Sequence, residues 1–209
     1  MYDQRVKDRA EFGVTAFVLA GGKSSRMGSD KAFLRLGDET LLSLALKAAG
    51  AVARDVHIVG DRQKFAAFDR VVEDVYRGQG PLGGIHAALS SSATELNLVL
   101  AVDLPFLGAD LLEYMLSRAR ESKATITVPL VGERLQPLCA VYRRGFAEVA
   151  ERSLREGKNK IDSLFASVAT CVIEEDELVR AGFSAEMFRN LNTPEEWEKA
   201  KSLQPEPES

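Results

Sequence analysis

Long hydrophobic runs are missing from this 209-residue sequence, which argues against a membrane protein. No stretch approaches the roughly 18 consecutive apolar residues that a spanning helix needs. The opening residues, MYDQRVKDRAEFG, are charged and contain no apolar segment typical of a secretory signal. We therefore expect a cytoplasmic protein without membrane contact, in which residues 1–12 form an N-terminal extension.

Cysteine and histidine are also scarce, and positive charge is not in excess over negative charge. Cys139 and Cys171 lie in separate strand-like runs without a CxxC partner, so we expect buried, reduced thiols rather than a disulfide or a metal centre. His57 and His86 have no metal-ligating neighbours in the sequence and are expected to be packing residues. The formal net charge of −4 gives no general attraction for nucleic acid, so any phosphate site must be a local pocket.

Short β-branched runs alternate with helical segments along most of the chain. Strand-like runs are predicted at residues 14–20, 55–60, 70–74, 96–103, 124–130, 137–142 and 169–175. Helices are predicted at residues 41–52, 82–91, 109–120 and 145–155. This alternation is typical of an α/β fold with a mostly parallel central sheet and crossover helices. We predict one domain over residues 13–202 and a flexible, polar tail over residues 203–209.

A glycine-rich, cationic loop follows the first strand, with the sequence LAGGKSSRMGSDK over residues 19–31. Glycines allow the backbone to approach an anion closely, and Lys23, Arg26 and Lys31 supply positive charge. The loop matches neither GxxxxGK[ST] nor GxGxxG. A solvated loop is the simpler alternative, but the position directly after a buried strand favours a triphosphate site.

The loop resembles the signature LAGGxxxRMGxDK of the molybdenum cofactor guanylyltransferases, which are nucleotidyltransferases with a single-domain, three-layer, Rossmann-like fold. The resemblance extends along most of the chain. It implies that the nucleotide-binding residues of the loop are Leu19, Ala20, Gly21, Gly22 and Lys31. It also implies that Arg26 contacts the phosphates.

Carboxylates end two of the predicted strands. Asp103 ends the run LNLVLAVD, where it can bind Mg²⁺ together with substrate phosphates and water, although an aspartate before a proline turn is also an ordinary cap. Asp74 precedes the segment GPLGGI, which by itself reads as a strand-to-helix turn. The resemblance implies that Asp103 is the metal ligand and that both Asp103 and Asp74 contact the nucleotide.

The second strand departs from the family. The family places an asparagine near the end of this strand, whereas HIVGDR offers Val59, Gly60 and Asp61. We therefore expect base recognition at this strand to differ from that of the family, so that this strand gives no support for guanine over other bases.

Three later segments concern the acceptor of the nucleotide. QPLCAVY at 136–142 and NLNTPEE at 190–196 resemble segments of the molybdenum guanylyltransferases. Asn190 and Asn192 either support a helix cap or contribute to a pterin pocket, and the basic segment 157–160 either meets the acceptor phosphate or is solvated.

The resemblance implies transfer of GMP from GTP to molybdenum-molybdopterin, which yields the molybdopterin guanine dinucleotide and pyrophosphate. Arg26, Lys31 and Asp103 would be the catalytic residues, with Mg²⁺ on Asp103. Transient contacts with proteins that deliver or accept the cofactor are also expected. The alternatives are a cytidylyltransferase for the same cofactor, a sugar-phosphate nucleotidyltransferase, and a nucleotide-binding regulator without catalysis.

Overall fold

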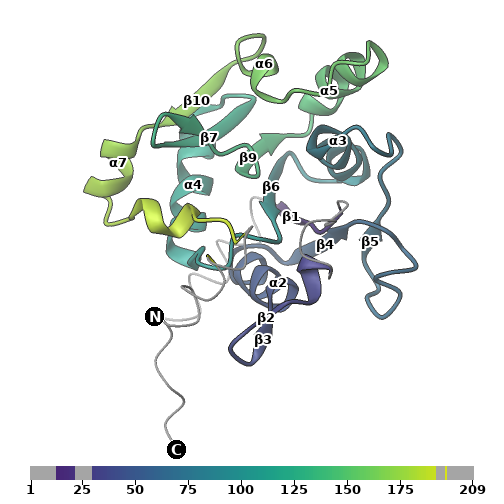
Figure 1. Ribbon diagram of the computed structural model, residues 1–209. Coiled ribbons are helices and arrows are strands. Elements are labelled where there is room, and N and C mark those ends of the chain that lie inside the picture. Colours follow the sequence, from purple (N-terminus) through teal and green to yellow (C-terminus); the bar gives the residue numbers. More distant parts are fainter. Residues whose placement is uncertain (1–12, 22–29, 192–195, 197–209) are drawn as a thin grey trace, which may run out of the picture.

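A central sheet with helices on both faces forms the protein in the computed structural model, which describes residues 13–21, 30–191 and 196 (Figure 1). The strands of the sheet are β1 (Val14–Leu19), β4 (Asp55–Val59), β5 (Val71–Val72), β6 (Leu96–Ala101), β7 (Ile126–Val131), β8 (Arg134–Leu135), β9 (Cys139–Arg143) and β10 (Thr170–Ile173). Their order is β10-β7-β9-β6-β1-β4-β5, with β8 paired to β7.

The long helices are α2 (Leu41–Val52), α3 (Pro81–Ser91), α4 (Ala109–Ser122) and α5 (Phe146–Arg155). All four were predicted from the sequence, within two residues at each end. The shorter elements are the hairpin β2 (Arg35–Leu36) and β3 (Glu39–Thr40), the helices α6 (Asp162–Phe165) and α7 (Glu175–Arg180), and the 3₁₀ turns η1 (Lys31–Phe33) and η2 (Ala185–Phe188). Within the described residues no helix is both long and apolar enough to cross a membrane.

The sheet is mostly parallel, as predicted. β6, β1, β4 and β5 are neighbours and run parallel, and β10 runs parallel to β7. β8 and β9 are the exceptions, because both lie antiparallel to β7, and β9 is also antiparallel to β6. A short turn after β7 leads into this antiparallel segment, which therefore needs no crossover helix.

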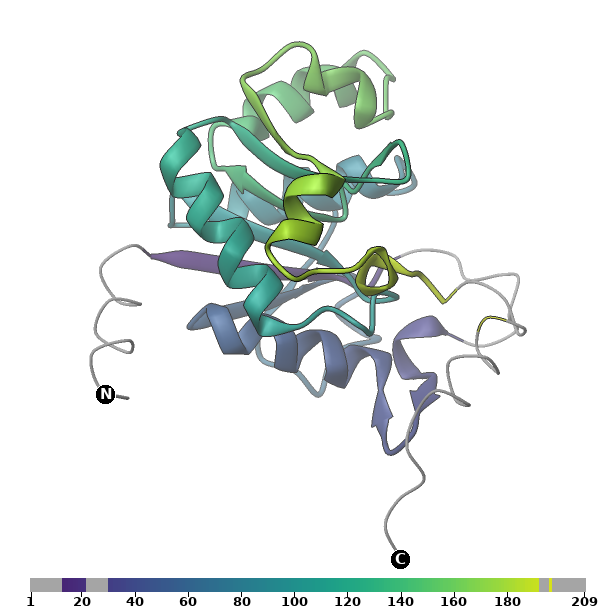
Figure 2. The same cartoon turned by 90° about the vertical axis from the view of Figure 1, so that its left-hand side faces the viewer.

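Alternate residues of the central strands enter two separate cores. In β1, Ala16 and Val18 pack in the core that includes α2 and α4, whereas Phe17 and Leu19 pack in the core that includes α3 and α5. Figure 2 shows the helices on either side of the sheet. A strand that is covered on both faces needs apolar residues at every position, which explains the unbroken apolar runs of the sequence.

Candidate active site

The carboxyl ends of four parallel strands lie level with one another. Leu19 pairs with Val59 on one side and with Ala101 on the other, and Val59 pairs with Val72. The ladder continues for one more residue, with Ala20 N donating to Val59 O at 2.9 Å and Val102 N donating to Leu19 O at 3.1 Å.

Gly60 N likewise donates to Val72 O at 3.0 Å. Consequently Gly21, Asp61, Asp74 and Asp103, each two residues beyond a strand end, leave the sheet at the same edge. Ligands of open α/β sheets bind at such an edge. The structure therefore brings together segments that are distant in the sequence.

Lys31 and Asp103 are in direct contact across this edge. The Nζ of Lys31 donates to Asp103 Oδ2 at 3.0 Å, and both side chains are largely shielded from water. Lys31 is held by η1, which Asp30 caps by accepting the N–H of Ala32 at 3.1 Å. A cation of the glycine-rich loop thus neutralises the carboxylate at the end of β6.

The loop itself is described only at its two flanks. Gly22 and Arg26, both expected at the phosphates, lie outside the described residues. Ala20 uses its N–H in the ladder, and its carbonyl accepts a hydrogen bond from Lys64 Nζ at 3.1 Å. Gly21 is exposed at the sheet edge, where a ligand can reach its backbone.

Asp103 has the chemistry of a magnesium ligand. Mg²⁺ is usually held by one or two carboxylates, with substrate phosphates and water as the other ligands. Asp103 supplies one partly exposed carboxylate at the strand edge. Within the described residues no group of three or more His, Cys, Asp or Glu side chains could hold a metal by itself. The residues therefore fit a metal that arrives with a nucleotide.

Asp74 lies against the first turn of α3. Its Oδ1 accepts the N–H of Tyr76 at 2.8 Å. A Cβ placed on Gly83 would lie 2.6 Å from Asp74 Oδ2 and 2.9 Å from Tyr76 O, so only glycine leaves room for this carboxylate. Burial raises the pKa of the Asp74 carboxyl, and the Tyr76 N–H and the nearby charge of His86 oppose that rise.

The end of β4 is occupied by a local turn where the family has an asparagine. Asp61 Oδ1 accepts the N–H groups of Gln63 at 2.8 Å and Lys64 at 3.0 Å, and these bonds lower the pKa of the Asp61 carboxyl. Gly60 is packed against Phe65, whose ring would lie 2.6 Å from a Cβ at that position. Asp61 thus shapes the chain that follows β4 and brings Lys64 to the site, a residue that the sequence did not single out.

The segments expected near the acceptor have different surroundings. Cys139 to Tyr142 of QPLCAVY are buried in β9, so only its first residues remain accessible to a ligand. Leu191 N donates to Asp103 O at 3.2 Å, which ties the segment around Asn190 to the proposed metal ligand. Asn190 is exposed, whereas Asn192 lies outside the described residues.

The basic segment 157–160 resembles a solvated turn more than a phosphate site. Lys158 Nζ donates to Glu156 Oε2 at 2.7 Å, and both side chains are exposed. The N–H of Lys158 donates to Ser153 O at 2.9 Å, which closes the turn after α5. Of the two interpretations of this segment, these contacts favour the solvated one.

The two histidines pack against neighbouring side chains, and the two cysteines form no disulfide. His57 stacks on Phe17 with ring centroids 5.3 Å apart, and His86 is buried in α3, so both pack as expected. Both cysteines are free, and burial raises the pKa of the Cys139 thiol. The expectation of two buried thiols was wrong for Cys171, which is only partly buried because β10 is the edge strand of the sheet.

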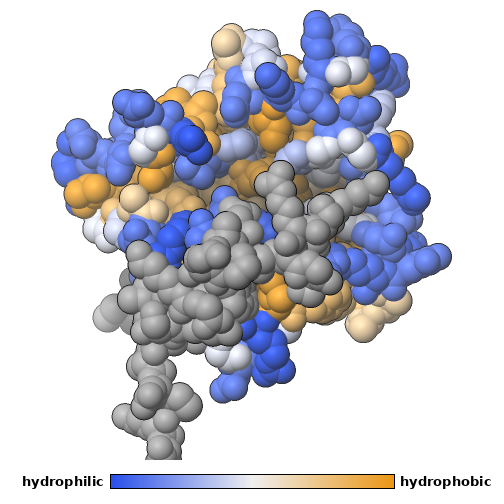
Figure 3. Space-filling view, in the orientation of Figure 1, coloured by the Kyte–Doolittle hydropathy of each residue, from blue (hydrophilic) through white to orange (hydrophobic). Residues whose placement is uncertain are grey.

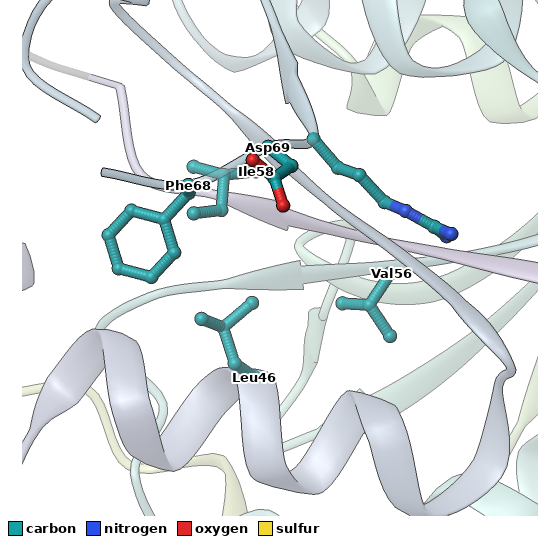
Figure 4. Close-up of a pocket in the computed structure, with 6 residues that line it drawn as sticks. Leu46, Val56, Ile58, Phe68 and Asp69 are labelled. Carbon is teal, nitrogen blue, oxygen red and sulfur yellow. The ribbon is translucent and has the colours of Figure 1, made fainter. Parts of the chain in front are cut away.

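A hollow of about 270 Å³ lies elsewhere, between α2 and β4 (Figure 4). It is lined by Leu46, Val56, Ile58, Phe68, Asp69 and Arg70. None of the residues that the sequence assigns to the site lines it. On the face shown in Figure 3, hydrophilic residues dominate the outer parts of the described surface. We therefore locate the site by the strand ends and their charges, not by the hollow.

Comparisons with known proteins bear on the family of the chain. The profile of the MobA-like NTP transferase domain matches residues 16–171. A protein of Pelotomaculum thermopropionicum named as a probable molybdenum cofactor guanylyltransferase is 36% identical, over 90% of this chain and 92% of its own. The molybdenum cofactor guanylyltransferase of Syntrophotalea carbinolica is 32% identical, over 90% of each chain.

The fold is shared with a solved structure. The crystal structure of molybdopterin-guanine dinucleotide biosynthesis protein A from Archaeoglobus fulgidus has a TM-score of 0.80. It is 24% identical in sequence, and the match covers 90% of this chain and 97% of that one. The predicted three-layer nucleotidyltransferase fold is therefore confirmed, and the chain belongs to the MobA-like NTP transferase family.

Proposed function

We propose that this protein transfers GMP from GTP to molybdenum-molybdopterin, forming the molybdopterin guanine dinucleotide and pyrophosphate. The observation that carries this proposal is the contact between Lys31 and Asp103 at the level strand ends, where a triphosphate and its metal would meet a cation and a carboxylate. The names of the relatives support guanine as the base and molybdopterin as the acceptor.

The reaction is an in-line displacement at the α-phosphorus of GTP. A terminal phosphate oxygen of molybdopterin forms the new P–O bond, and the bond to the β-phosphate breaks as pyrophosphate leaves. The attacking phosphate is already ionised, so the protein need not supply a general base. Such transfers depend on positioning and charge stabilisation, not on a protein nucleophile.

Each proposed residue has a role in this reaction. Asp103 would hold Mg²⁺, which neutralises phosphate charge when bound. Lys31 and Arg26 would stabilise the charge that develops on pyrophosphate, and the backbone from Leu19 to Gly22 would hold the nucleotide. Asp74 would contact the nucleotide beside α3. The proposal also includes a cytoplasmic location and transient contacts with proteins that deliver or accept the cofactor.

Pyrophosphate release tests the proposal directly. The purified protein is given Mg²⁺ and GTP, CTP, ATP or UTP separately, each with and without molybdenum-loaded molybdopterin. Release with GTP only when the pterin is present is the expected result. Release with CTP would assign the protein to cytidylyl transfer. Silence with all four nucleotides would lead to the same assay with sugar phosphates as acceptor, where release would assign the protein to that class. Nucleotide binding without any release would indicate a regulator.

A further inference from the structure

Lys64 connects the two flanks of the glycine-rich loop. Its Nζ donates to the carbonyl oxygen of Ala20 at 3.1 Å and forms an ion pair with the carboxylate of Asp30. Ala20 lies before loop residues 22–29, and Asp30 follows them. One ammonium group therefore joins two positions that are ten residues apart in the chain.

The ammonium group is held in place by its surroundings. The turn after β4 fixes the backbone of Lys64, because Asp61 accepts its N–H. Its Nζ lies 4.5 Å from the ring centroid of Phe65, which is fully buried, and 5.8 Å from that of Phe33. The Lys64 side chain is only 20% exposed. A cation near an aromatic face and bonded to two oxygens has little freedom to move.

The contact of Lys64 with Asp30 leads directly to the proposed catalytic pair. Asp30 uses its other carboxylate oxygen, Oδ1, to accept the N–H of Ala32, and so caps η1. Lys31 is the first residue of η1, and it contacts Asp103. The ion pair thus fixes the turn from which the Lys31 side chain extends.

We propose that Lys64 is a positioning residue for the nucleotide. It fixes Ala20 and Asp30, which flank the glycine-rich loop, relative to each other, and through η1 it directs Lys31 toward Asp103. This inference rests on the proposed function in one respect, namely that the ligand of the loop is a nucleoside triphosphate. We assign Lys64 to positioning because the contacts of its ammonium group are to protein oxygens at Ala20 and Asp30.

The chain offers a matched control in Lys47. Its ion pair with Glu39 is 3.6 Å long, and the lysine side chain is 75% exposed. Pairs of this kind contribute little to stability. Comparing Lys64→Met with Lys47→Met therefore separates the specific effect of the loop contact from the general effect of losing one lysine.

The test measures Mg·GTP affinity by calorimetry without acceptor, and KM and kcat for GTP with acceptor. Loss of a charge-assisted, partly buried hydrogen bond predicts that Lys64→Met raises Kd and KM about tenfold, with a smaller change in kcat. Lys64→Arg should restore most of the affinity, and Lys47→Met should match the wild type. Because Asp30 acts with Lys64, the double variant Lys64→Met/Asp30→Asn should raise Kd much less than the product of the increases in the two single variants.

Hydrogen exchange at the Ala32 amide provides a readout that needs no activity. Lys64→Met should accelerate this exchange, since Asp30 loses the cation that holds it over η1. Unchanged KM, Kd and exchange in folded Lys64→Met protein would overturn the inference. If the wild-type protein binds CTP or another triphosphate instead of GTP, the guanylyl proposal fails, and the same comparison with that nucleotide still decides the role of Lys64.

Discussion

Lys31 Nζ and Asp103 Oδ2 lie 3.0 Å apart, so a cation of the glycine-rich loop shares the carboxylate that we assign to the metal. Lys31 and Mg²⁺ should therefore compete for Asp103 before the nucleotide is in place. When GTP binds, its phosphates offer Lys31 a new partner. The pair thus links nucleotide binding to the availability of the metal ligand.

Lys31→Met should lower both the rate of the reaction and its requirement for Mg²⁺. The rate of pyrophosphate release should fall about 100-fold, because a charged contact to the phosphates is lost. The Mg²⁺ concentration for half-maximal rate should also fall, because no cation competes for Asp103. A Mg²⁺ titration of the rate measures both, with Lys47→Met as the control. A higher Mg²⁺ requirement in Lys31→Met would contradict the competition.

Asp103→Asn should lower pyrophosphate release by at least about 100-fold, because the amide binds Mg²⁺ poorly. The variant should remain folded, since the carboxylate is partly exposed at the sheet edge. Asp38→Asn, in the exposed turn between β2 and β3, is the matched control and should be as active as the wild type. Undiminished turnover in Asp103→Asn would remove this residue from the metal site.

Gly83→Ala should displace Asp74, because the new methyl group would lie 2.6 Å from its carboxylate. We expect a loss of about 1–3 kcal/mol in the free energy of unfolding and a higher KM for GTP. Gly50→Ala is the control, since a Cβ there meets no atom within 4 Å. That helical position in α2 should gain about 0.5–1 kcal/mol. Denaturant unfolding and GTP titration of both variants provide the comparison.

Asp74→Asn should make the protein more stable at neutral pH but weaken nucleotide binding. Burial raises the pKa of Asp74 above its ordinary value of 3.8, so the folded state binds the proton more tightly than the unfolded state. Ionisation of Asp74 therefore lowers stability as pH rises through 3.8 and the folded pKa. The stability gain of Asp74→Asn should be present at pH 7 and absent below pH 3.8. Equal free energies of unfolding for the wild type and Asp74→Asn at pH 7 would show that burial does not penalise this carboxylate.

The fold and several candidate site residues follow from local features of the sequence. The unbroken apolar run of β1, the glycines and cations after it, and the aspartate that ends the run of β6 are all visible in short segments. The rule that ligands bind beyond the carboxyl ends of parallel strands then places Lys31 and Asp103 together, as the structure shows.

Other features depend on contacts that no short segment reveals. The antiparallel direction of β9 follows from its partners β6 and β7, since an apolar run does not specify direction. The strand predicted at 70–74 is only Val71–Val72, because β5 is an edge strand that pairs with β4 alone. Lys64 reaches Ala20, 44 residues away in the sequence, through a turn that the side chain of Asp61 shapes.

A competition between bases tests the central claim most directly. The protein is incubated with Mg²⁺, molybdenum-loaded molybdopterin and equal concentrations of GTP and CTP, and the pterin dinucleotide product is identified by mass spectrometry. We predict the guanine dinucleotide, formed in equal amount to pyrophosphate. Formation of the cytosine dinucleotide, or of no dinucleotide while the protein binds GTP, would contradict the assignment.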